Sequence, residues 1–213
     1  HIWDCCFDHG YLGTYLLSHF SKQNKHKVQI NFVDQVTHIT EQLCNKLKQS
    51  PFSHYEVHTL DARHLELTKN KRHCIIIAGV TTTGTLKILQ TLLNQHPNQD
   101  LDFILCPTRG QYDLRQYLIK QKAHLIEENH ILENNRHYEL MFVRIYGNND
   151  QNVCKQVSSI GKFWQKNNAA HLSYLANRIC HYQQEVLDPS KHDALEAVQL
   201  YSKMHQHICS TKI

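Results

Sequence analysis

Short apolar runs alternate with amphipathic segments over the first two thirds of the chain, and this alternation most constrains the fold. Cys74-Ile75-Ile76-Ile77-Ala78 is apolar at every position, which is typical of a strand buried on both faces of a parallel sheet. Comparable strand-like runs occur at 2–6, 27–34, 55–61, 73–80 and 101–107, and helix-like segments at 11–20, 38–47, 86–93 and 114–121. The polar turn 133–136 separates two further strands, 123–132 and 137–145. The pattern predicts an α/β fold, with a mostly parallel Rossmann-like sheet and a terminal antiparallel hairpin.

The last third of the chain has a different pattern. The polar run 147–152 resembles a linker, and apolar residues then recur at helical spacing from Leu172 to Ile179 and from Ala194 to Ile208. We therefore expect two domains, residues 1–146 and a helical, coiled-coil-like region at 147–213. The helical pair would dock on the sheet, grip a partner or form a dimer.

Composition narrows the class of protein. The 213 residues are 41% hydrophobic and 20% charged, and no apolar run approaches the length of a membrane span. The net charge of +4 permits a nucleic-acid partner without requiring one. No signal peptide is recognisable, so we expect a cytoplasmic protein, and since the first strand begins near residue 1 we expect native residues to precede it.

The many histidines and cysteines do not form a recognisable metal motif. The 18 histidines are scattered singly, and the 8 cysteines include no C-x-x-C pair. Several cysteines lie in apolar runs, where a free thiol behaves as a small hydrophobe. We expect neither a structural metal nor a disulfide.

Acidic residues stand at the ends of successive predicted strands. Ligands of open α/β sheets bind outside the carboxyl ends of the strands. There the sequence places Asp4, the turn Asp8-His9-Gly10, Asp34, Asp61, Ala78-Gly79 and Cys106-Pro107-Thr108. An acid after the second strand suits the two hydroxyls of a ribose, and an acid after the third suits an adenine amino group.

The first turn lacks a phosphate-binding loop. Neither G-x-x-x-x-G-K-[ST] nor G-x-G-x-x-G is present, so S-adenosylmethionine fits better than NAD or ATP. The stretch from Ile2 to Gly13 has three interpretations: a cofactor turn, a thiol site, or the edge of a core. We favour the cofactor turn, with Cys5 and Cys6 as packing residues.

Several motifs resemble those of the bacterial tRNA (adenine-N1)-methyltransferases of the TrmK type. The family opening D-I-G-[ST]-D-H-A-Y-L is similar to residues 4–12, and I-A-G-M-G-G to residues 77–82. The family Q-P-N, with a later Arg and Trp-Leu, is similar to Cys106-Pro107-Thr108, Arg115 and Tyr117-Leu118. A late E…Y-E is met by Glu128 and Tyr138-Glu139. The resemblance implies a class I methyltransferase fold with a C-terminal helical domain, and methylation of an adenine in the tRNA D-arm at position twenty-two.

The resemblance also implies a set of site residues. The residues expected to hold S-adenosyl-L-methionine are Asp4, Cys6, Asp8, His9, Gly10, Asp34, Gln35, Asp61, Ala62, Ala78, Gly79 and Val80. The residues expected at the reacting base are Asp8, Cys106, Pro107 and Thr108. The residues expected to contact the RNA are Tyr11, Thr81, Thr82, Arg109, Arg115 and Tyr138, although Tyr11 and Tyr138 also suit a plain core.

The sequence departs from the family at several of these positions. Cys6 stands where the family has glycine, so we expect its backbone to avoid positive φ. Thr81 and Thr82 replace glycines, and Cys106 and Thr108 replace amide side chains. Three functions therefore remain: a tRNA adenine methyltransferase, a methyltransferase of another RNA site or small molecule, or a non-catalytic relative with the pocket closed at Thr81-Thr82-Thr83. Loop lysines and arginines suit phosphate contact or a solvated surface: Lys22, Lys25, Lys27, Lys69, Lys71, Arg72 and Arg109.

Overall fold

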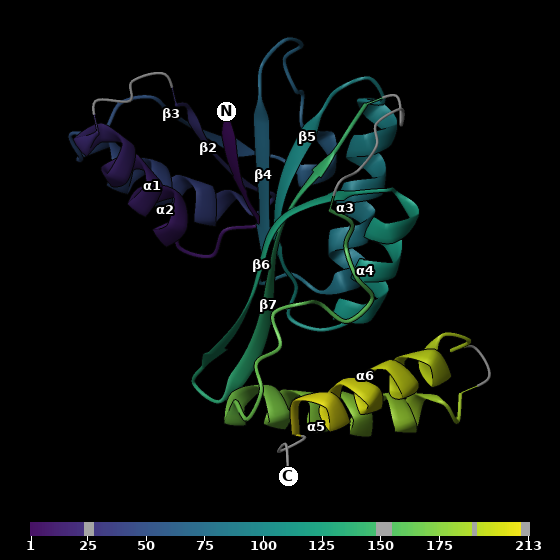
Figure 1. Ribbon diagram of the computed structural model, residues 1–213. Helices are drawn as coiled ribbons and strands as arrows, with labels where there is room; N and C mark the ends of the chain where they lie inside the picture. Colours follow the sequence, from purple (N-terminus) through teal and green to yellow (C-terminus); the bar gives the residue numbers. More distant parts are fainter. Residues whose placement is uncertain (24–27, 148–154, 189–190, 210–213) are drawn as a thin grey trace.

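One seven-stranded sheet organises the molecule (Figure 1). The computed structural model describes residues 1–23, 28–147, 155–188 and 191–209. The strands are β1 (Ile2–Cys5), β2 (Ile30–Asp34), β3 (Tyr55–Thr59), β4 (His73–Ala78), β5 (Leu101–Cys106), β6 (His124–Glu133) and β7 (Arg136–Ile145). Their order is β3-β2-β1-β4-β5-β7-β6, with β1 to β5 parallel and β7 antiparallel to both of its neighbours. The predicted sheet and its terminal antiparallel hairpin are confirmed.

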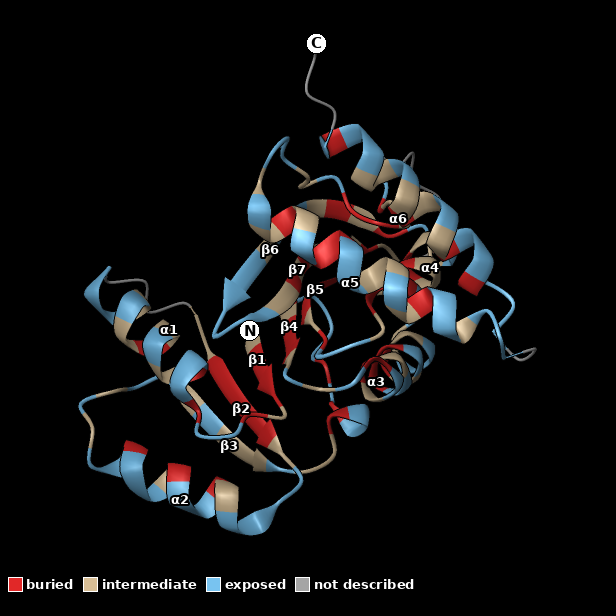
Figure 2. Cartoon of the chain, turned by 90° about the horizontal axis from the view of Figure 1, so that it is seen from below, coloured by how far each residue is buried: buried red, intermediate tan, exposed pale blue. Residues whose placement is uncertain are grey.

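Helices cover both faces of this sheet. They are α1 (Tyr11–Lys22), α2 (Thr37–Lys48), α3 (Thr82–Gln95) and α4 (Gln111–Lys120), with a 3₁₀ turn, η1 (Ala62–His64). Successive residues of a strand point to opposite faces, so Phe32 packs in the cluster under α1 and α2 while Val33 packs in the cluster under α3 and α4. Figure 2 shows the central strands as the buried layer between these helices.

Four strands, β1, β3, β4 and β5, end one or two residues earlier than the sequence predicts. For β1 and β4 the backbone shows the cause. Cys6 has φ 58° and Gly79 has φ 75°, and a positive φ turns the backbone out of the extended path. The expectation that Cys6 avoids positive φ is therefore wrong. A helix also begins earlier than predicted, at Thr82, because the Thr81 side chain accepts a hydrogen bond from the Gly84 backbone N–H and caps α3.

Two C-terminal helices, α5 (Ala169–Glu185) and α6 (Ala194–Cys209), pack together at the end of the sheet where the parallel strands finish (Figure 1). Tyr112 of α4 joins their core, where the Tyr182 and Tyr201 rings stack at 5.7 Å. Beyond Gly147, the predicted linker lies outside the described residues. No helix in the described part of the chain has the length and apolar character of a membrane span.

Candidate functional site

A cleft of about 510 Å³ opens at the carboxyl ends of β1 to β4. The strand order reverses at β1, from which the chain goes first to β2 and later, on the other side, to β4, and this switch point is where such sheets bind ligands. The cleft brings together seven of the predicted cofactor residues: Cys6, Asp34, Gln35, Asp61, Ala62, Gly79 and Val80. The rest of its lining comes from α3, through Gly84, Lys87 and Ile88, and from Val33, Val36, Ile39, Leu60 and Arg63.

The two strand-end acids in this cleft differ in how they are held. Asp34 accepts a hydrogen bond from the Val36 backbone N–H at 2.8 Å through Oδ1. Asp61 accepts from the backbone of Arg63 and forms a two-pronged ion pair with its guanidinium, at 2.6–3.1 Å. The hydrogen bond from Arg63 lowers the pKa of Asp61, so this carboxylate is ionised at neutral pH. An adenine amino group would share Asp61 with Arg63, whereas Asp34 is held by one backbone contact.

The cysteines of the first turn lack the properties of a reactive thiol. Burial raises the pKa of Cys6 to about 11 and that of Cys5 further, so both are protonated at neutral pH. Reactive cysteines have the opposite shift. The backbone N–H of Cys6 donates to the Val33 carbonyl at 2.8 Å, which holds the turn against β2.

Five predicted cofactor residues lie outside the lining of the cleft, and three of them, Asp4, Gly10 and Ala78, support its first turn or the end of β4. Asp4 is buried and accepts a hydrogen bond from the Gly13 backbone N–H at 2.9 Å, which ties β1 to α1. Burial raises the pKa of Asp4 to about 6. Gly10 has φ 67° and packs against Leu43, where a side chain would collide, and Ala78 ends β4. These residues support the structure around the cleft and do not line it.

Asp8 and His9 line a second, adjoining hollow of about 300 Å³ between α1 and α2. Their side chains pair at 2.8 Å, and the His9 ring stacks on Tyr11 at 5.3 Å. Tyr11 is 70% exposed, so the alternative that it belongs to the core is wrong. Ile39 lines both hollows, which places Asp8 and His9 beside the cofactor cleft.

The turn Cys106-Pro107-Thr108, which the sequence predicts to lie at the reacting base, follows β5. The Thr108 backbone N–H donates to the Val80 carbonyl at 3.0 Å, so this turn lies against the loop after β4. The hydroxyl of Thr82 donates to the carbonyls of Arg109 and Gly110, and its side chain is buried. Thr82 therefore braces this turn rather than facing a substrate, and neither it nor Thr81 lines the cleft. The structure does not support the alternative in which Thr81-Thr82-Thr83 closes the cofactor pocket, because none of the three lines the cleft.

A third pocket, of about 340 Å³, lies on the other side of this turn. It brings together the predicted residues Thr108, Arg109 and Tyr138 with residues of α5. Its full lining is Thr108, Arg109, Gln111, Arg136, His137, Tyr138, Tyr174, Asn177 and Arg178. Sequence reasoning missed Arg136, His137 and Arg178, because they meet only when the hairpin and α5 converge.

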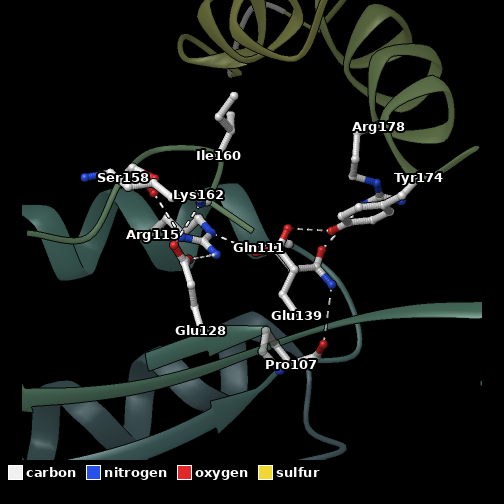
Figure 3. Close-up of polar contacts among 12 residues, drawn as sticks. Pro107, Gln111, Arg115, Glu128, Glu139, Ser158, Ile160, Lys162, Tyr174 and Arg178 are labelled. Carbon is white, nitrogen blue, oxygen red and sulfur yellow. Dashed lines mark hydrogen bonds and ion pairs between the residues drawn. The ribbon is translucent and has the colours of Figure 1, made fainter. Parts of the chain in front are cut away.

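Arg115 does not contact a substrate (Figure 3). It is fully buried, and its guanidinium pairs with Glu139 at 2.7 Å and with Glu128 at 2.8 Å. The Tyr174 hydroxyl donates to Glu139 at 2.7 Å, and Arg115 donates to the Ser158 carbonyl at 3.0 Å. The predicted RNA contact at Arg115 is thus corrected: the residue joins α4 and the hairpin to the C-terminal region.

We call the contact between α4, the β6–β7 hairpin and the C-terminal region, centred on Arg115, the C-terminal junction. Histidines and aromatic rings pack beside Arg115 in this junction. His130 and His137 lie across the hairpin with ring nitrogens 2.9 Å apart, and both rings stack on Tyr174. Burial lowers the pKa of His130 to about 4. In the part of the chain that the structure describes, no group of three or more His, Cys, Asp or Glu side chains is arranged to hold a metal ion.

Comparisons with known proteins agree with this geometry. A family model described as a methyltransferase domain matches residues 1–141, and the chain belongs to this methyltransferase-domain family. No curated protein matches the sequence. The structural comparisons show a class I, Rossmann-like methyltransferase fold, as the sequence predicts.

Three solved structures illustrate the shared fold. TrmK of M. capricolum, in complex with S-adenosyl-homocysteine, is 18% identical with a TM-score of 0.66, over 97% of this chain and 90% of that one. The B. subtilis M1A22 tRNA methyltransferase TrmK is 18% identical with a TM-score of 0.62, over 97% and 89%. A protein of the NADB-Rossmann superfamily from Streptococcus agalactiae is 16% identical with a TM-score of 0.71, over 96% and 90%.

Proposed function

We propose that the protein is an S-adenosylmethionine-dependent methyltransferase that methylates N1 of an adenine in the D-arm of tRNA. The observation that carries the proposal is the open cleft at the switch point of the sheet, with Asp34 at its rim. Two solved structures of the same fold, which span the sheet and the helical pair, are of TrmK proteins, and one of these is an M1A22 tRNA methyltransferase.

The residues of the cleft fit this cofactor. Asp34 suits the ribose hydroxyls, because its carboxylate has a single backbone contact and points into a cleft rather than into an ion pair. At Gly79, a Cβ atom would meet nothing within 4 Å, so the backbone there faces open space in which a ligand can approach. We assign Gln35, Ala62 and Val80 to the adenosine end, and Asp8 and His9, in the adjoining hollow, to the methionine end.

The chain's own residues act mainly by positioning. When bound, the cofactor would supply a methyl group that is activated by its sulfonium centre. The N1 lone pair of adenine is the nucleophile, so the protein needs no strong base and instead holds the base in line with the methyl. The turn Cys106-Pro107-Thr108 lies beside Val80 of the cleft, so Thr108 can orient the adenine edge.

We assign residues 1–146 to cofactor binding and the helical region 147–213 to holding the RNA. The boundary is supported by the separate apolar core of α5 and α6. Tyr112 and the Arg115 network cross this boundary, so a truncation near Tyr146 would expose both. A tRNA substrate also favours a cytoplasmic location.

Transfer of a labelled methyl group to unmodified tRNA tests the proposal. Nucleoside analysis should find the label in N1-methyladenosine, and an RNA with the D-arm adenosine replaced by guanosine should remain unlabelled. Label in another nucleoside would move the activity to another RNA site. Cofactor binding without transfer to any RNA would contradict the proposed function.

A further inference from the structure

Three arginines without carboxylate partners meet in the 340 Å³ pocket beside the Thr108 turn. Each of the chain's other arginines forms an ion pair: Arg63 with Asp61, Arg72 and Arg144 with Asp102, and Arg115 with Glu128 and Glu139. Among the described residues, Arg109, Arg136 and Arg178 have no carboxylate within ion-pair distance, and no Asp or Glu lines their pocket. The unpaired guanidinium charge is therefore concentrated at one place.

These arginines come from three separate elements. Arg109 belongs to the turn after β5, Arg136 begins β7, and Arg178 lies in the middle of α5. Three like charges repel one another, so bringing them together costs free energy unless an anion compensates them. Arg109 and Arg136 are exposed at the mouth of the pocket, whereas Arg178 is half-buried in its wall.

Arg178 is held in place and retains an unused donor. Its guanidinium lies 5.5 Å from the centre of the Tyr174 ring, and Nη1 donates to the Gln111 side chain at 3.4 Å (Figure 3). Its Nε is buried and has no hydrogen-bond partner in the described structure. Tyr174 is fixed in turn by its hydrogen bond to Glu139. A buried donor without a partner is costly, so a small turn of the Arg178 guanidinium toward an anion in the pocket would be favourable.

The pocket adjoins the place where the target base would react. Thr108 lines the pocket, and its backbone N–H is bonded to the carbonyl of Val80, which lines the cofactor cleft. An anion in the pocket is thus separated from the cofactor cleft by the width of one turn. Guanidinium groups bind phosphate oxygens with several parallel hydrogen bonds, a geometry that an ammonium group does not match.

We propose that Arg109, Arg136 and Arg178 form a binding site for a backbone phosphate of the RNA, next to the nucleotide that is methylated. The proposal rests on the proposed function and deepens it. The site would fix the backbone beside the target base, and so help to hold that base near the Thr108 turn. Because α5 supplies Arg178, the site also gives the helical region a specific part in the reaction.

The test compares arginine variants of the full chain. Arg136→Gln and Arg178→Gln should each weaken tRNA binding about tenfold, the loss expected for one charge-assisted hydrogen bond, and each should reduce the salt dependence of binding by about one phosphate contact. Lys120→Gln is the matched control, because it removes one exposed positive charge, unpaired among the described residues, from the end of α4 that lies away from the pocket. Affinity for S-adenosylmethionine should remain unchanged in all three variants.

An RNA with a neutral methylphosphonate linkage identifies the phosphate. With the linkage next to the target adenosine, the wild type should lose at least the tenfold in affinity that Arg136→Gln loses on normal RNA, and the two proteins should then bind the modified RNA about equally. Arg136 is exposed, so its replacement leaves the fold intact. If the wild type methylates tRNA but both pocket variants bind RNA as Lys120→Gln does, the phosphate site is wrong and the proposed function stands. If the wild type binds no tRNA, both proposals fail.

Discussion

Asp34 in the cofactor cleft and Arg115 in the C-terminal junction are both charged side chains, but the fold holds them in opposite ways. In the cleft, Asp34 has one backbone contact and faces the open space. In the junction, Arg115 is buried between Glu128 and Glu139. The difference shows that a charge is available to a ligand only where the fold leaves it without a protein partner. The pocket of Arg109, Arg136 and Arg178 belongs, by this criterion, with the cleft.

The largest expected effect is in the junction. Arg115→Met should lower the free energy of unfolding by about 3–5 kcal/mol, because it leaves two carboxylates buried without their cation. Urea unfolding measures this loss. Arg72→Met, which breaks a pair with an exposed arginine, should cost about 0–1 kcal/mol. Equal losses in the two variants would erase the distinction between the regions.

Local sequence pattern predicts the cleft better than the junction. Asp34, Asp61 and Gly79 lie at strand ends, and parallel strands bring their carboxyl ends to one edge of the sheet, so their proximity follows from the strand pattern alone. For Arg115, the sequence pattern predicts an RNA contact, and this prediction is wrong. Its partners come from the hairpin and from Ser158 and Tyr174, and no local spacing encodes that convergence. Cys6 shows a different limit, since its positive φ is imposed by the turn against the preference of its side chain.

Asp4, which lies under the cleft, should make the free energy of unfolding depend on pH. Burial raises the pKa of Asp4 from 3.8 to about 6, so the folded state binds this proton more tightly than the unfolded chain does. Its contribution to stability is full below about pH 4 and is lost as the pH rises through about 6. Between those limits, Asp4→Asn should gain about 2–3 kcal/mol relative to the wild type. Chemical unfolding across this pH range would show no such gain if Asp4 kept an ordinary pKa.

His130, in the C-terminal junction, should make the free energy of unfolding change with pH in the opposite direction over the same pH range. Burial, with His171 and His137 nearby, lowers its pKa from 6.5 to about 4, so the folded state favours the neutral ring. The contribution is full above about pH 6.5 and is lost as the pH falls through about 4. His130→Gln should therefore lose less stability than the wild type on acidification, as measured by urea midpoints. If the urea midpoints of both proteins fell equally on acidification, His130 would not be the source of the pH dependence.

The smallest expected effect concerns the backbone of the first turn. Cys6→Gly should be more stable than Cys6→Ala by about 1 kcal/mol, because only glycine adopts φ 58° without a steric penalty. Thermal unfolding of the two variants measures the difference. Equal melting temperatures would mean that the turn relaxes to negative φ when the thiol is removed.

The most direct test of the account is calorimetry of S-adenosylmethionine binding. The wild type should bind the cofactor, and Asp34→Ala should bind it about ten- to a hundredfold more weakly, because it loses a charge-assisted hydrogen bond to the ribose. Asp100→Ala is the matched control, since Asp100 precedes β5 at the opposite ends of the strands and, among the described residues, accepts a hydrogen bond from the Gly147 backbone N–H. Its affinity should equal that of the wild type. Unchanged affinity in Asp34→Ala would contradict the placement of the cofactor in this cleft.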